Sequence, residues 1–146
     1  MKPMTDAQWQ EFVLAGTRTG KLATLRKDGR PHVTPVWFLL DHTGGQRPEL
    51  VFTTWHRSVK AAALHRDPRF ALCVDDQEAP YGYAMLECTA RLTEDPAELL
   101  SWATRIGARY MGRERADEYG RRNSVPGEYL VRATIDHVIA HQGISD

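Results

Sequence analysis

The sequence has little cysteine, no excess of charge of either sign and no long hydrophobic run. Its 146 residues include two cysteines, and its 19 basic and 19 acidic residues leave a formal net charge of zero. A disulfide-stapled secreted domain is rich in cysteine, and a nucleic-acid-binding domain carries a basic face. Neither class is favoured, so we expect no nucleic-acid partner and predict that Cys73 and Cys88 are reduced core residues.

The longest uncharged stretch that is rich in apolar residues, Val33 to Leu40, has eight residues, whereas a helix that spans a bilayer needs roughly 20. The N-terminal segment 1–16 contains Asp6 and Glu11 and lacks the basic and apolar regions of a secretory signal. We therefore expect a cytoplasmic protein without a membrane partner. A chain of this length is expected to form one domain, over residues 1–146.

Short extended segments dominate the hydrophobic pattern. Alternating or β-branched runs between turn residues predict strands at 22–25, 31–41, 49–54, 69–75, 81–92 and 128–141. Helical spacing and capping residues predict helices at 5–16, 58–66, 95–110 and 114–122. Most strands are joined by turns too short for parallel crossovers, so we predict a mainly β fold: an antiparallel sheet closed or partly closed into a barrel, with flanking helices.

The helix expected from residue 95 carries every signal of a helix start. Asp95 is the expected cap, Pro96 takes the first position, and Glu98 would complete a capping box. Its expected inner stripe is Leu99, Trp102, Ala103, Ile106 and Tyr110.

The segment from Val36 to Leu40 is apolar on both alternating faces of its predicted strand. Water cannot cover one of these faces, so a helix, a cofactor or a second subunit must do so. Trp37 lies in this segment, and Tyr81 and Tyr83 share one face of another strand, where a flat ring could stack. The alternative is that Trp37 and one tyrosine fill the core.

Residues 53–60 lie where a predicted strand gives way to a predicted helix. The unpaired N–H groups of a first helical turn and the helix dipole stabilise an anion. Ser58 is the expected cap, and Arg57 and Lys60 add two cations. Hydroxyl donors come from Thr53 and Thr54. Together these residues resemble a phosphate cradle; the alternative is a capped surface helix with two ordinary basic residues.

Metal binding and nucleophilic catalysis are not favoured. His137 and His141 have the spacing of a helical zinc site, but on a strand their rings would stand roughly 13 Å apart. Ser58 lacks a G-x-S-x-G setting, and no side chain is assigned as catalytic. His32 lies either where the edge of a ligand could reach it or at an exposed strand end.

Several short motifs follow one another along the chain. They are Leu-Ala-Thr-Leu at 22–25, Asp-Gly-Arg-Pro-His at 28–32, Thr-Pro-Val-Trp-Phe at 34–38, Ser-Val-Lys at 58–60, Leu64 and Asp-Pro-Arg at 67–69. Their order resembles that of the pyridoxamine 5'-phosphate oxidase-like split-barrel superfamily, whose FMN-binding split barrel has a strand–helix unit that binds phosphate. The resemblance runs from about Lys21 to the C-terminus, and it is closest to the branch that uses the deazaflavin coenzyme F420.

The resemblance implies a homodimer with a cofactor at the subunit interface, its phosphate held by one chain and its ring partly covered by the other. The residues that would bind the cofactor are His32, Thr34, Pro35, Val36, Thr53, Thr54, Arg57, Ser58 and Lys60, with Tyr81 and Tyr83 from the partner subunit. Many relatives place Arg-Asn before the helix leucine, whereas this chain has Ala62-Ala63. Either the remaining donors suffice, or the protein binds F420 weakly, binds FMN instead or has lost the cofactor.

The activity that the resemblance implies is that of an F420-dependent oxidoreductase. It would transfer hydride from the reduced deazaflavin to a small planar or unsaturated acceptor, with water or His32 as the proton donor. The alternatives are an FMN-dependent oxidase or reductase of the same fold, and an F420-binding protein without catalytic activity. The segments 41–48 and 114–127 are the expected variable walls of the acceptor site.

Overall fold

The computed structural model describes residues 1–45 and 47–146; Gln46, in the expected wall segment 41–48, lies outside them. The strands of the described chain are β1 (Lys2–Pro3), β2 (Gly20–Leu25), β3 (Pro31–Val36), β4 (Leu39–Asp41), β5 (Glu49–Trp55), β6 (Arg69–Asp76), β7 (Gly82–Thr93) and β8 (Glu128–Gln142). Its helices are α1 (Asp6–Leu14), α2 (Val59–Arg66), α3 (Pro96–Met111) and α4 (Ala116–Arg122), with the 3-10 turn η1 (Arg113–Arg115). None of these helices is long and apolar enough to cross a membrane.

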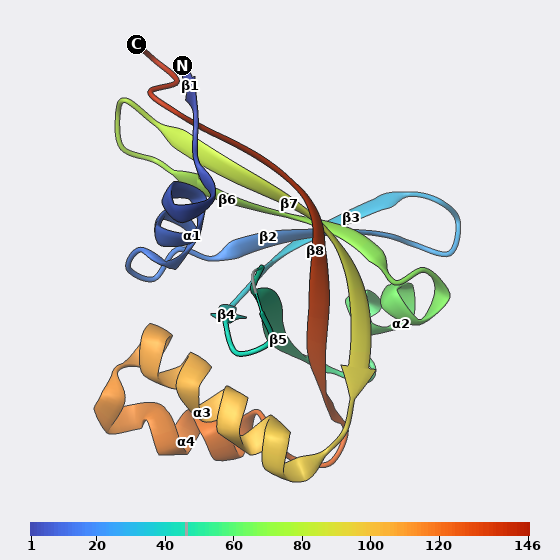
Figure 1. Cartoon of the computed structure of the whole chain (residues 1–146). Helices are drawn as coiled ribbons and strands as arrows, with labels where there is room; N and C mark the ends of the chain where they lie inside the picture. The colour runs from blue at the N-terminus through green and yellow to red at the C-terminus, as the bar shows by residue number, and fades with distance from the viewer. Residues whose placement is uncertain (46) are drawn as a thin grey trace.

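The strands form one antiparallel sheet in the order β3-β2-β6-β7-β8-β5-β4, with β1 paired to the end of β8. The two edge strands, β3 and β4, are consecutive in the chain and are separated only by Trp37 and Phe38. This short link brings the edges together and curls the sheet into a barrel, shown with its flanking helices in Figure 1. The predicted mainly β fold is confirmed. The barrel is split because no ladder joins the edge strands β3 and β4 in the described residues.

The single extended segment expected at 31–41 is wrong at Trp37 and Phe38, which leave the sheet. Helix α3 satisfies the backbone of Phe38 in place of a neighbouring strand. The Tyr110 hydroxyl accepts from the Phe38 N–H at 3.3 Å, and the Arg109 guanidinium donates to its carbonyl at 2.8 Å. With these bonds made to side chains, the chain can turn here without leaving buried backbone groups unpaired.

The inside of the barrel is mainly apolar. Side chains from strands all round the sheet are fully buried there, among them Leu22, Phe52, Leu72, Leu86 and Val131. Helix α1 closes one end of the barrel with Trp9 and Val13. This helix starts with a capping box, because Thr5 accepts from the Gln8 N–H while the Gln8 side chain accepts from the Thr5 N–H.

Helix α3 packs on the outside of the barrel, against β5 and β8. Leu99 and Trp102 form a second buried cluster with Val51 and Leu130. Four residues of the expected inner stripe are buried: Leu99, Trp102, Ala103 and Ile106. A helix therefore covers the outer face of this part of the barrel.

An ion-pair network fixes α3 to the sheet and overturns the expected capping box. Arg132 on β8 donates to Glu98 of α3 at 2.5 Å and to Asp41 of β4 at 2.7 Å. Its guanidinium also lies 5.4 Å from the centre of the Trp102 ring. Because Arg132 engages Glu98, this side chain does not turn back to the helix start, and Asp95 makes no side-chain cap bond.

Both cysteines are free thiols, but only one is a core residue. Burial raises the pKa of Cys88 to about 12, so its thiol stays protonated. Cys73 is half-buried and lies opposite Met85, on the outer face of the sheet rather than in the core. The expectation of two core thiols is therefore correct for Cys88 and wrong for Cys73, whose strand turns this side chain away from the barrel interior.

Candidate functional site

A cleft of about 460 Å³ lies where the barrel is split, a volume typical of small-molecule sites. The ends of β3 and β5, the start of α2, one face of α3 and the connection from α4 to β8 surround it. Six of the eleven predicted cofactor-binding residues line this cleft: Pro35, Val36, Thr53, Thr54, Ser58 and Lys60. The structure therefore brings most of the predicted residues together.

Ser58 caps α2, as expected. Its hydroxyl oxygen accepts from the Ala61 N–H at 3.1 Å and lies 2.8 Å from the Thr54 hydroxyl. The N–H groups of Val59 and Lys60, at the first two helical positions, have no acceptor within the helix. The half-buried Lys60 side chain lines the cleft beside them. Free N–H groups, two hydroxyls and an ammonium at one corner are suited to hold an oxyanion.

The opposite wall contains three polar residues that the sequence did not indicate: Arg122 and Asn123 at the end of α4, and Glu128 at the start of β8. Burial raises the pKa of Glu128 above its usual value, against the nearby charges of Arg122, His56 and Lys60, which lower it. The segment 114–127 was expected to form a variable wall, and Arg122 and Asn123 lie in it. No local motif marks Glu128, because a strand start faces a cleft only through its tertiary pairing.

Gly127 holds this wall against the end of β5. Its φ of +103° lies in the region that side chains disfavour, and an added Cβ would stand 2.7 Å from the Trp55 ring and 2.9 Å from Nδ1 of His56. The Gly127 carbonyl accepts from the His56 N–H at 2.8 Å and lies 3.0 Å from Nδ1 of His56. Only glycine allows both the turn and this close approach, so Gly127 sets the place of Glu128.

Trp37 forms an aromatic wall of the cleft and is fixed from behind. Its ring stacks on Tyr110 at 5.1 Å with an interplanar angle of 5°, and Tyr119 lies 5.7 Å away. The Tyr110 hydroxyl donates to the Arg18 carbonyl at 2.9 Å. Helices α3 and α4 thus cover the apolar segment that was expected to need a helix, a cofactor or a second subunit.

His32 and Thr34 lie on the same face of β3 as Val36, but outside the cleft lining. Nδ1 of His32 and Oγ1 of Thr34 are buried without a partner in the described residues, as is Oγ1 of Thr24 on the paired strand. These atoms leave hydrogen-bonding capacity for a ligand or water. Arg57 is exposed and also lies outside the lining.

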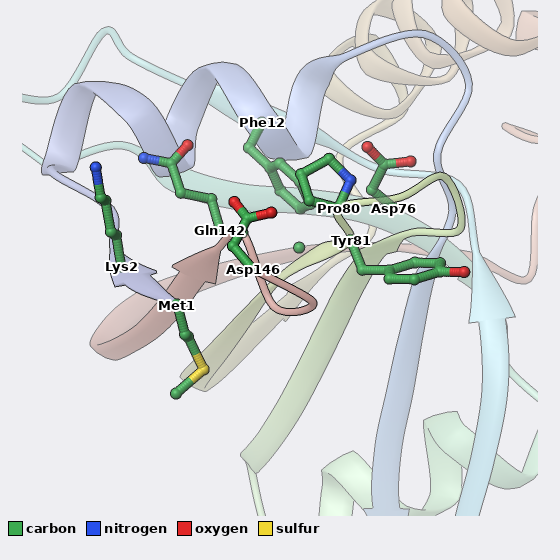
Figure 2. Close-up of a pocket in the computed structure, with 10 residues that line it drawn as sticks. Met1, Lys2, Phe12, Asp76, Pro80, Tyr81, Gln142 and Asp146 are labelled. Atoms are coloured by element: carbon green, nitrogen blue, oxygen red, sulfur yellow. The ribbon is translucent and has the colours of Figure 1, made fainter.

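Tyr81 and Tyr83 lie at the far end of the molecule from the cleft, near the chain termini. Tyr81 is 47% exposed, adopts a φ of +62° and borders a second cavity, where its ring points away from Lys2 and Gln142 (Figure 2). The hydroxyl of Tyr83 lies 3.3 Å from Nδ1 of His141. Within one chain these tyrosines do not meet the cleft.

The fold and the site together define a split antiparallel barrel with a polar, cation-bearing cleft at its opening. The sequence pattern of the pyridoxamine 5'-phosphate oxidase family matches residues 5–142, and the chain belongs to that family.

Solved structures agree with this fold. The chain is 26% identical to the conserved hypothetical protein Rv2991 from Mycobacterium tuberculosis, with a TM-score of 0.80 over 97% of this chain and 87% of that one. An F420 reductase gives 24% identity and a TM-score of 0.66 over 88% and 94%. HutZ, a heme storage protein from Vibrio cholerae, gives 18% identity and a TM-score of 0.71 over 98% and 100%. The last two likenesses concern the fold alone.

The cleft suits a flavin-type cofactor, the kind that this fold binds. The Ser58 and Lys60 corner offers donors to a phosphate, and the Trp37 wall offers a flat apolar surface beside it. Glu128 is the lining residue that does not suit an anion, because it brings a carboxylate into the same space.

Proposed function

We propose that this protein is an F420-dependent reductase that transfers hydride to a small planar or unsaturated acceptor. The observation that carries this proposal is the cleft at the split of the barrel, which brings the Ser58–Lys60 corner and the Trp37 wall into one space. The F420 reductase among the structural neighbours supports the choice of cofactor. When bound, the deazaflavin would supply the hydride, and the protein would supply its orientation.

Different residues of the cleft contact the phosphate and the ring of the cofactor. Lys60 and the free N–H groups at the start of α2 hold the phosphate, with Thr53 and Thr54 beneath it, and the exposed Arg57 adds long-range attraction. Pro35 and Val36 line the ring. His32 and Thr34, which precede them on β3 and lie outside the cleft lining, are proposed to reach the edge of the ring with their unpaired atoms.

No side chain of the cleft is assigned as the proton donor. Water and His32 are the two candidates for this role. The free thiols Cys73 and Cys88 support a reducing compartment, the cytoplasm, as the place where the protein works.

We further propose that the active form is a homodimer. The outer face of β3, β2, β6, β7 and β8 carries small and apolar side chains, Val33, Ala23, Ala71, Cys73, Met85 and Ile139, with Lys21, Glu87 and His137 in the same rows. Val33 is 60% exposed in the single chain. Tyr83 lies on this same outer face, so a second copy seated there would bring Tyr83 and the neighbouring Tyr81 toward its partner's cleft. Light scattering after gel filtration should give a dimer mass; a monomer at all concentrations would exclude this proposal.

Equilibrium titration of the purified protein with F420 and with FMN tests the proposed cofactor. Replacing Lys60 by alanine should weaken F420 binding roughly 10- to 100-fold, the effect of one charge-assisted hydrogen bond. The matched control is Lys2→Ala, which removes an exposed lysine far from the cleft. Absence of binding to either cofactor, or equal affinities for the Lys60 and Lys2 variants, would contradict the proposal.

The two alternative activities give different results in the same assays. An FMN-dependent oxidase or reductase would bind FMN more tightly than F420 and would be yellow after purification. An F420-binding protein without catalytic activity would bind F420 tightly and reduce no compound in a panel of acceptors.

A further inference from the structure

Glu128 is an unexpected member of a cleft that is otherwise built for an anion. It is half-buried at the first position of β8, opposite Trp55 in the β5 ladder. Gly127 fixes it there by the close contact with Trp55 and His56 described above. A carboxylate in this position repels a bound phosphate and therefore affects which phosphate groups the cleft accepts.

The charges that line the cleft nearly balance one another. Lys60 and Arg122 bring two positive charges, and Glu128 brings one negative charge. The lining therefore carries one net positive charge, to which the start of α2 adds a partial one. His56, which follows β5, lies near Glu128 and lowers the pKa of this carboxyl, but it is not part of the cleft lining. A lining with one net positive charge balances a phosphate group with one negative charge better than a phosphate group with two.

The two candidate cofactors differ in this property. The phosphate group of F420 is a diester and carries one negative charge, apart from the carboxylates of the tail that follows it. The phosphate of FMN is a monoester, and since the second pKa of a phosphomonoester is about 6, it carries close to two negative charges at pH 7.5. The additional charge of FMN would lie in the same cleft as the Glu128 carboxylate.

We propose that Glu128 is a specificity-determining residue, which makes the cleft select a phosphodiester over a phosphomonoester. The inference rests on the proposed function, since it assumes that the phosphate of the cofactor lies at the Ser58–Lys60 corner. It assigns Glu128 no part in hydride transfer. Burial, which raises the pKa of Glu128, shows that its charge is incompletely screened by water, and a poorly screened charge discriminates more strongly.

The experiment measures dissociation constants for F420, FMN and riboflavin at pH 7.5 on the full-length protein. The variants are Glu128→Gln, which removes the charge and keeps the shape, and Glu128→Asp, which keeps the charge. Glu94→Gln is the matched control, because Glu94 is exposed on the turn before α3 and lies outside the cleft lining. Riboflavin lacks the phosphate, so it reports any effect of Glu128 on the ring or the ribityl chain.

The Glu128→Gln variant should bind FMN about tenfold more tightly relative to F420 than the native protein does, which is the order of effect of one unit charge in a partly buried site. Riboflavin affinity should stay within about twofold, and Glu128→Asp should retain the native preference. If Glu128→Gln changes F420 and FMN binding equally, or changes neither, the role of Glu128 is overturned while the proposed function stands. If the native protein binds neither cofactor, both the proposed function and the role of Glu128 are overturned.

Discussion

Asp41 should make the free energy of unfolding depend on pH in the acid range. Its side chain is 7% exposed, and burial raises its pKa. The hydrogen bonds from Arg132 and Thr43 outweigh this effect and lower the pKa from 3.8 to about 2. A carboxyl whose pKa is lower in the folded protein contributes stability that is complete above pH 4 and is lost as the pH falls through 2. Lowering the pKa of Asp41 from 3.8 to about 2 corresponds to a free energy of about 2 kcal/mol in favour of the folded state.

Replacing Asp41 by asparagine tests this value. Urea unfolding at pH 7 should show a loss of about 2 kcal/mol in the free energy of unfolding, since Arg132 keeps Glu98 and Glu49 as partners and is not left unpaired. The difference between the native protein and the variant should shrink as the pH falls from 4 to 2. Asp117→Asn, an exposed change on α4, should cost less than about 0.5 kcal/mol at every pH.

A constant difference between pH 7 and pH 2.5 would refute this reasoning. The loss would then come from altered packing around Asp41 rather than from its ionised form. A loss at pH 7 no larger than that of Asp117→Asn would refute it as well, because the hydrogen bonds from Arg132 would then contribute no net stability.

Three further variants test how the cleft is held. Arg109→Met should lower the free energy of unfolding, measured in urea, by about 3 kcal/mol, since it removes the donor to the carbonyls of Val13, Gly16 and Phe38. Arg105→Met, a change at an exposed arginine of the same helix, should lower it by less than half as much. Gly127→Ala should lower the melting temperature and weaken cofactor binding, because its φ and both contacts exclude a Cβ; unchanged binding would separate Gly127 from the site. Gly120→Ala should loosen α4 from α3, where a Cβ would collide with Thr104, and the change should appear as faster amide exchange in α4.

The strand–helix unit at 49–66 could be predicted because its signals are local. A short apolar run, Leu50 to Phe52, marks β5, Ser58 caps the helix, and Asp67-Pro68 ends it. The predicted phosphate corner depends on these local signals alone.

The other wall of the cleft could not be predicted, because tertiary contacts decide it. Glu128 faces the cleft through its pairing with Trp55, which is 73 positions earlier in the chain. The break at Trp37 and Phe38 follows from hydrogen bonds to α3 that no local pattern encodes. Asp95 carries a strong capping signal, yet Glu98 is drawn to Arg132 on a distant strand.

The opening of the barrel and the stability of the fold have one physical origin. If Trp37 and Phe38 stayed in the extended conformation, β3 could continue along β5, and the split that holds the cleft would close. Tyr110 and Arg109 prevent this by bonding the backbone of Phe38 themselves. Stacking on Tyr110 then turns Trp37 into the cleft wall. The helix that keeps the sheet from closing therefore also builds the site, so variants that loosen α3 should lose stability and cofactor affinity together.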